Sequence, residues 1–181
     1  ISPNPSFPKR GKSPLGKGGL RGIFILQCDL QLMNASKTFV AMRSGSMHDV
    51  IIAGAGPAGT SCARECARDG LKTLLLDKDT FPRSKPCGGV VSGRALSLLD
   101  FTLSDHIVEQ ECYGARVHYG GRTIEVHSKY RIAVLVSRER FDAFLADKAV
   151  ESKAQFVPGE KVVAVQEAGD GVTVVSEKAT Y

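Results

Sequence analysis

The most regular pattern of apolar and polar positions lies between residues 49 and 78. Val50 to Ala53 is a continuous apolar run rich in β-branched residues, which predicts a strand buried on both faces. The run ends at a glycine-rich turn, after which small residues recur at helical spacing: Gly59, Ala63, Cys66 and Ala67. A second apolar run, Thr73 to Leu76, ends in Asp77. The pattern predicts a strand–helix–strand unit with parallel, buried strands.

The turn inside this unit has the spacing of a dinucleotide-binding fingerprint, Gly54-x-Gly56-x-x-Gly59. Gly54 allows the tight turn, Gly56 lets the backbone approach a pyrophosphate, and Gly59 lets the helix pack closely on the strand. Pro57 suits the first helical turn, where no N–H is needed. The helix N-terminus offers unpaired N–H groups and a positive dipole end to phosphates.

A lone glycine pattern is weak evidence, and the alternative is a glycine-rich turn in an ordinary α/β domain. Here strand, glycines, small-residue helix, second strand and terminal acid follow in order within roughly thirty residues. Asp77 can accept two hydrogen bonds from a ribose diol. The sequence therefore predicts an α/β, Rossmann-like FAD/NAD(P)-binding fold with a central parallel sheet and a dinucleotide site.

The pattern changes twice after this unit. Residues 78–92 contain two prolines and a glycine pair, which predicts an ordered loop, and Gly93 to Leu99 predicts a short helix capped by Ser92. Alternation over 115–119 and 124–126, around Gly120-Gly121, predicts a hairpin.

Another strand is expected at Ile132 to Val136, then a helix from Arg138 to about Glu151 with Ser137 as its N-cap. Its apolar face is formed by Phe141, Phe144, Leu145 and Ala149. Residues 156–157, 160–166 and 172–175 predict a strand and a second hairpin that turns at 169–171.

Charge and composition exclude several classes of protein. With 43% apolar residues the chain can bury a core, and it contains no apolar run of the ~18 residues that cross a membrane. The net charge of +5 comes from residues 1–47, which hold seven Lys or Arg and one acid, against 17 basic and 18 acidic residues in the remainder. We therefore expect no nucleic-acid partner, because no basic patch with interleaved aromatic residues survives this division.

Residues 1–47 are predicted to be a disordered, non-native extension. They are rich in Pro, Gly and Ser without periodicity, and Lys- and Arg-rich, acid-poor composition is also typical of a transit peptide. Part of the segment resembles translated repeats found between bacterial genes. We expect translation to start at Met42 or Met47. The alternative is a disordered functional arm.

The five cysteines are an odd set without zinc spacing, so no metal site is predicted. Cys62 and Cys66 lie one helical turn apart, as small buried thiols that pack on a sheet. A reducing cytoplasm fits this usage best.

Three segments together resemble a known family. They are Asp49-Val-Ile-Ile-Ala-Gly-Ala-Gly-Pro-Ala-Gly59, Phe81-Pro-Arg-Ser-Lys-Pro-Cys-Gly-Gly89 and Val136-Ser-Arg-Glu-Arg-Phe-Asp142. The combination is similar to the FAD-dependent geranylgeranyl reductase family, within the flavoproteins related to para-hydroxybenzoate hydroxylase. The first segment is shared by many flavoenzymes, and the Lys85-Pro-Cys-Gly-Gly89 portion is the more specific part.

The resemblance implies FAD as cofactor and a position for each of its parts. Ala58 and its neighbouring glycines would face the pyrophosphate, Asp77 the adenosine ribose, and the Val162 backbone the adenine. Gly88, Gly89 and Val91 would line the flavin, and Arg138 would reach back to the cofactor. The predicted cofactor-binding residues are Gly54, Gly56, Pro57, Ala58, Gly59, Asp77, Lys78, Arg83, Gly88, Gly89, Val91, Arg138 and Val162. Without the family, Arg138 would be a first-turn surface arginine and Val162 a core strand residue.

Cys87 is the candidate catalytic residue, with its sulfur beside the flavin. The alternative is a small residue that fits a tight loop. Thiol reactivity needs a lowered pKa, and the cations near it in sequence are Arg83 and Lys85.

The activity that the resemblance implies is reduction of isolated double bonds in geranylgeranyl or other polyprenyl chains, with NAD(P)H or a ferredoxin as electron donor. Alternatives are a flavin monooxygenase or halogenase of the same fold, and a non-catalytic flavin-binding remnant. Val90 departs from the family, where many members have a third glycine or another small residue.

Residues 48–181 are expected to form a partial FAD-binding domain, incomplete at its C-terminus, with the start of a substrate domain at about 112–136. A second FAD motif, the part that binds a prenyl-lipid substrate and any peripheral membrane contact are expected beyond residue 181.

Overall fold

The computed structural model describes residues 47–168 and 171–181. The predicted N-terminal extension, with Cys28 and Met42, lies outside the described residues except for Met47, and so does most of the turn at 169–171.

The predicted strand–helix–strand unit is present as β1 (Val50–Ala53), α1 (Pro57–Arg68) and β2 (Thr73–Asp77). β1 and β2 are parallel, with Val50 opposite Thr73. A third strand, β8 (Gln155–Pro158), joins β2 in parallel and completes a sheet of order β1-β2-β8. Every residue of β2 is buried, as expected for a strand covered on both faces.

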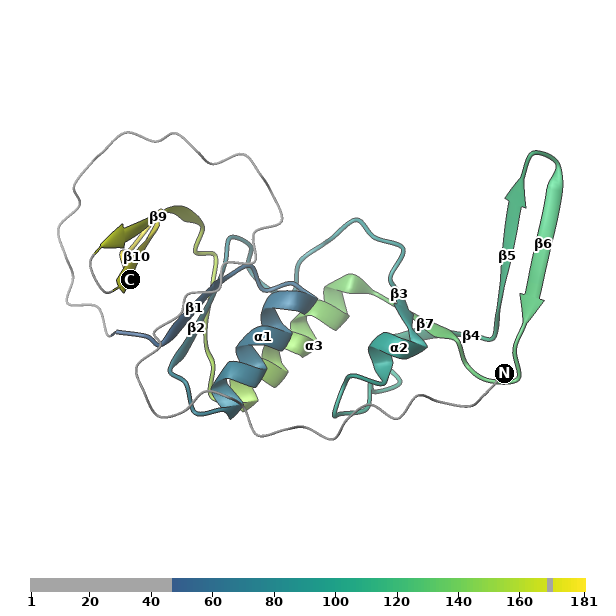
Figure 1. Cartoon of the computed structure of the whole chain (residues 1–181), viewed down its shortest axis with the longest axis horizontal. Coiled ribbons are helices and arrows are strands. Elements are labelled where there is room, and N and C mark those ends of the chain that lie inside the picture. The colour runs from purple at the N-terminus through teal and green to yellow at the C-terminus, as the bar shows by residue number, and fades with distance from the viewer. Residues whose placement is uncertain (1–46, 169–170) are drawn as a thin grey trace.

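Two layers cover this sheet. α1 and α3 (Arg138–Glu151) lie side by side over one face (Figure 1), where Ile52 and Leu75 meet Ala63 and Ala149. Both alanines are fully buried, and their small side chains allow the helices to approach the strands closely. On the other face, Leu74 and Leu76 form a core cluster with Val174 of the hairpin β9 (Val162–Ala168) and β10 (Gly171–Ser176). The sheet core therefore holds the glycine turn rigidly at its edge.

A second, antiparallel sheet places the loop that carries Cys87. Its order is β3 (Val90–Ser92), β7 (Ala133–Val136) and β4 (Val108–Cys112). Val134 and Val136 form an apolar cluster with Phe141 and Leu145 of α3. Because α3 contacts both sheets, it fixes this loop relative to the glycine turn.

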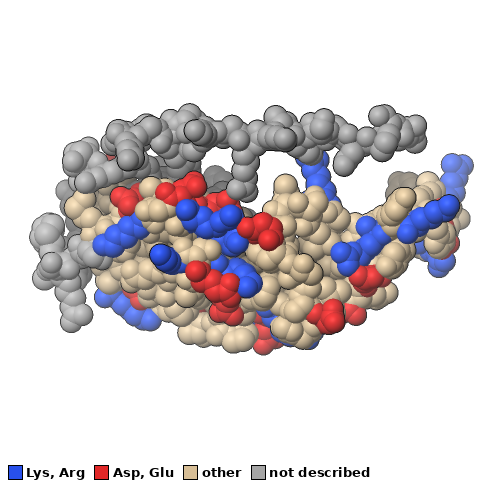
Figure 2. Space-filling model, turned by 90° about the horizontal axis from the view of Figure 1, so that it is seen from below, with Lys and Arg blue, Asp and Glu red and all other residues tan. Residues whose placement is uncertain are grey.

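The hairpin β5 (Gly114–Tyr119) and β6 (Arg122–His127) projects from one end of the molecule (Figure 1). Tyr119 is paired with Arg122, so the turn falls on Gly120-Gly121 as predicted. Its alternating apolar side chains are exposed, with Val117 at 60% and Ile124 at 67%. On the face shown in Figure 2, acidic and basic side chains are interspersed.

Three local predictions need correction. The loop predicted over residues 78–92 is wrong at its end, because Val90–Ser92 pairs with β7 as β3. The short helix α2 (Gly93–Leu96) stops before Leu99, although Ser92 Oγ accepts the predicted capping bond from the Ala95 N–H at 3.2 Å. Ser137 precedes α3 as predicted but makes no side-chain capping bond. Within the described ranges, no helix is long and apolar enough to cross a membrane.

Candidate functional site

The glycine turn between β1 and α1 is built by backbone constraints. Gly54 has φ +102°, a conformation that L side chains rarely adopt. A Cβ on Gly59 would lie 1.8 Å from the Gly54 carbonyl oxygen, so the helix can approach the turn only with glycine there. Around Gly56 the nearest atom to such a Cβ is Arg83 Nη2 at 3.9 Å. Pro57 is the first residue of α1. These features are those of a loop open to a phosphate at a helix N-terminus.

Asp77, at the end of β2, is tied to this turn. Its Oδ2 accepts a hydrogen bond from the Ala55 N–H at 2.6 Å, and its Oδ1 accepts one from the Asp79 N–H at 2.9 Å. The residue is 7% exposed. Asp77 thus holds the turn in place, and each of its oxygens keeps a further lone pair for a hydroxyl donor. Its contact with a ribose stays a prediction.

The two glycines after Cys87 differ in their surroundings. Gly88 is exposed, and a Cβ there would meet nothing within 4 Å. Gly89 is buried at φ +69°, and a Cβ there would lie 2.0 Å from the carbonyl oxygen of Val136, whose N–H donates to the Gly89 carbonyl at 2.9 Å. Gly89 is therefore required by β7, whereas Gly88 leaves room for a flat ligand.

A buried carboxylate joins two of the three family segments. Asp142 is fully buried and accepts two hydrogen bonds from Arg138, Nε to Oδ1 at 2.7 Å and Nη2 to Oδ2 at 2.9 Å. Arg83 Nη2 lies 3.1 Å from the same Oδ2, and its guanidinium stacks over Phe81 at 4.9 Å. We call this group the Arg83–Asp142–Arg138 cluster. Arg138 is therefore not the surface arginine of the alternative interpretation, because its side chain is 18% exposed.

Cys87 lies against this cluster. Its exposed thiol accepts a hydrogen bond from the Gly89 N–H at 3.5 Å and lies within hydrogen-bonding reach of Arg138. These two contacts, the Gly89 bond first, lower the pKa of Cys87 below its usual value. Bonding to Asp142 raises the pKa of Arg138 and keeps it charged. The expectation that Arg83 or Lys85 would act on Cys87 is wrong, because Arg83 bonds Asp142 and the cation at the thiol is Arg138.

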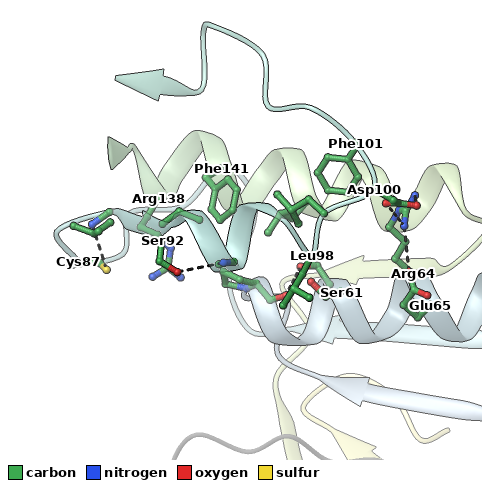
Figure 3. A pocket seen from close by; sticks show the side chains of 18 residues that line it. Ser61, Arg64, Glu65, Cys87, Ser92, Leu98, Asp100, Phe101, Arg138 and Phe141 are labelled. Atoms are coloured by element: carbon green, nitrogen blue, oxygen red, sulfur yellow. Dashed lines mark hydrogen bonds and ion pairs between the residues drawn. The ribbon is translucent and has the colours of Figure 1, made fainter. Parts of the chain in front are cut away.

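A pocket of about 720 Å³ runs along α1 from Cys87 to Asp100 (Figure 3). Its walls are mainly apolar: Val90, Val91, Ala95, Leu98, Leu99, Phe101, Phe141 and Leu145. At the far end the Asp100 carboxylate pairs with Arg64 at 2.8 Å and with Arg68 at 2.7 Å. One end of the pocket is therefore cationic and thiol-bearing, and the middle is apolar.

The structure brings five of the fourteen predicted site residues to the wall of one pocket. Pro57, Cys87, Gly89, Val91 and Arg138 line the pocket. Lys78 is exposed, and Val162 belongs to the core cluster on the opposite face of the sheet. Val162 follows Glu160, whose N–H donates to the Asp77 carbonyl at 2.7 Å, so it lies on the Asp77 side of the site.

Asp142 is the residue that sequence reasoning missed. The sequence predicts no role for it beyond ending the third family segment. The signal that was available is its i,i+4 spacing from Arg138, which places the two side chains on one helix face.

These residues fit a dinucleotide. The turn and the first residues of α1 would hold the pyrophosphate, and Asp77 the ribose. Arg83 adds a largely buried guanidinium beside Gly56. Its Nε lies 3.8 Å from Asp79 Oδ2, and neither Nε nor Nη1 makes a hydrogen bond among the described residues. Such orphaned donors next to a helix N-terminus suit an anion.

Comparison with known proteins agrees with this geometry. A family model described as FAD binding domain matches residues 47–180. Geranylgeranyl diphosphate reductase of Rhodobacter capsulatus is 32% identical over 134 residues, which cover 74% of this chain and 33% of that protein.

Solved structures show the same fold. A geranylgeranyl bacteriochlorophyll reductase-like protein from Thermoplasma acidophilum superposes with a TM-score of 0.67 at 25% identity, covering 74% of this chain and 36% of that one. A flavin-dependent brominase gives a TM-score of 0.57 at 26% identity, with coverage of 72% and 34%. The chain thus spans about a third of the length of these proteins. Since the family model covers most of the chain, the protein belongs to the FAD binding domain family.

Proposed function

We propose that the chain is the flavin-binding portion of an enzyme that reduces isolated double bonds of geranylgeranyl or other polyprenyl groups. The observation that supports this most directly is the pocket, since the start of α1 at Pro57 and the Cys87 loop line one mainly apolar space. Apolar walls suit an isoprenoid chain, and the chain is 32% identical over 134 residues to a geranylgeranyl diphosphate reductase.

Each part of the site has a task under this proposal. The turn and α1 bind the pyrophosphate, Arg138 holds positive charge at the pocket mouth, and Val91 and Phe141 exclude water. FAD bound here and reduced by the electron donor would supply the hydride, and a proton would complete the addition across the double bond. The electron donor is NAD(P)H or a ferredoxin, and the substrate a prenyl lipid met at a membrane surface.

The test uses the complete gene product that carries this chain. It is purified, its bound flavin is measured by visible absorbance, and it is incubated with a geranylgeranyl substrate and each donor in turn. We expect a yellow protein and product heavier by H2 for each reduced double bond, detected by mass spectrometry. A flavin-loaded protein that leaves every prenyl substrate unchanged contradicts the proposal.

The role of Cys87 needs its own variant. Cys87→Ala is expected to lower turnover while flavin content is kept. Cys112→Ala is the matched control, because Cys112 ends β4 and does not line the pocket. Equal turnover in both variants would show that Cys87 is only a small residue in a tight loop.

The likeness to the brominase favours a second candidate, a flavin-dependent halogenase or monooxygenase. Oxygen consumption by the reduced protein, with halide or hydroxyl transfer and no prenyl reduction, identifies that activity. A protein that binds no flavin under any refolding condition is instead a non-catalytic remnant.

A further inference from the structure

The Arg83–Asp142–Arg138 cluster contains two positive guanidinium groups and one negative carboxylate. One fully buried carboxylate faces two guanidinium groups, whose side chains are 10% and 18% exposed. A buried carboxylate is stable only when hydrogen bonds and opposite charge compensate it, and both of its oxygens are used here. These three groups together carry a net charge of +1 next to the N-terminus of α1, and the half-exposed Asp79, whose Oδ2 lies 3.8 Å from Arg83 Nε, balances part of it.

The two arginines serve different places. Arg83 comes from the loop before Cys87 and lies beside Gly56 of the turn, whereas Arg138 begins α3 and reaches the Cys87 thiol. Arginine binds a carboxylate through a rigid fork of donors, so moving the carboxylate moves the guanidinium with it. Asp142 is the group that both arginines share.

We infer that Asp142 is a positioning residue of the site: its carboxylate holds Arg138 against Cys87 and Arg83 against the glycine turn. The inference rests on the proposed function in that these two arginines are expected to face the cofactor. It adds the residue that sets their positions. Asp142 itself lies beneath the site and touches no substrate.

The pKa of Cys87 distinguishes two roles for Asp142: holding Arg138 in position, or acting on the thiol only through its negative charge. The charged side chains that act on its thiol are Arg138 and Asp142. Removing the negative charge of Asp142 alone would lower the pKa of Cys87. Releasing Arg138 would raise that pKa, and the Arg138 hydrogen bond is the larger of the two influences. The two interpretations therefore predict opposite signs.

The experiment measures the pH dependence of iodoacetamide alkylation at Cys87 in the 181-residue chain, with the Cys87 peptide followed by mass spectrometry. We expect Asp142→Asn to shift the alkylation midpoint upward, because the released Arg138 no longer lowers the pKa of Cys87. Glu139→Gln is the matched control, because it removes the same charge from an exposed neighbour on α3 and should leave the midpoint unchanged. A midpoint that falls or does not move in Asp142→Asn overturns the inference.

A second pair of variants covers loss of folding. Arg83→Met with Asp142→Asn removes one positive and one negative charge, so less uncompensated charge is buried. Relative to Arg83→Met alone, the double variant should again show a raised midpoint, and an equal midpoint overturns the inference. The measurement needs no flavin, so a chain that fails to bind FAD counts against the proposed function and not against this inference.

Discussion

Gly59→Ala tests the closest backbone contact in the site. The added Cβ would lie 1.8 Å from the Gly54 carbonyl oxygen and 3.0 Å from its carbon, so α1 must move away from the turn. Overpacking a tight site by one methyl group costs roughly 1–3 kcal/mol, and the upper end applies because both partners are backbone atoms. Alanine returns about 1 kcal/mol as a better helix residue than glycine. The net loss is about 2 kcal/mol of unfolding free energy.

The assay is thermal unfolding of the 181-residue chain followed by circular dichroism. A loss of this size lowers Tm by about 4–8 °C for a chain of this length. Gly56→Ala is the control, because Gly56 has φ −73° and its nearest contact would be 3.9 Å away, so its Tm should stay within about 2 °C of the parent. If Gly59→Ala melts with the parent, the turn and helix are not in the close contact that defines the site. Flavin affinity is expected to fall in both variants. In Gly56→Ala the only reason is that the added methyl group keeps the pyrophosphate from approaching the backbone.

Three further predictions concern the core and the thiols. Leu75→Ala, at a fully buried position of β2, should lower the free energy of unfolding by roughly 2–5 kcal/mol in a urea titration. Leu98→Ala, at a position that is 80% exposed, should leave it almost unchanged. Similar losses for the two variants would contradict the described core. Burial, followed by the neighbouring Cys62, raises the pKa of Cys66 to about 11, whereas the Gly89 N–H and Arg138 lower the pKa of Cys87. At neutral pH iodoacetamide should therefore modify Cys87 well before Cys66. The reverse order would refute this assignment. The pKa of Cys66 is higher in the folded state than its usual 9.0, so its contribution to stability is complete below pH 9.0 and is lost as pH rises toward 11. In urea titrations at several pH values across that interval, Cys66→Ala should lose less stability than the parent.

The sequence by itself determined the elements whose signals are local. Val50–Ala53 and Thr73–Asp77 are apolar runs flanked by turn residues, so strand position follows from composition and period. Gly54, Gly56 and Gly59 were identifiable because a turn and a close approach need glycine at fixed spacing. The hairpin around Gly120-Gly121 was equally local.

The tertiary structure decided what depends on contacts between distant segments. Val90–Ser92 became a strand only because β7 lies beside it, and nothing within those three residues predicts that pairing. Arg83 was placed near Cys87 by sequence distance, but packing of α3 brings Asp142 to Arg83 and brings Arg138 to Cys87. A side chain's partner depends on which element packs against it. Charge pairing across 59 residues of chain, from Arg83 to Asp142, is therefore a property of the fold.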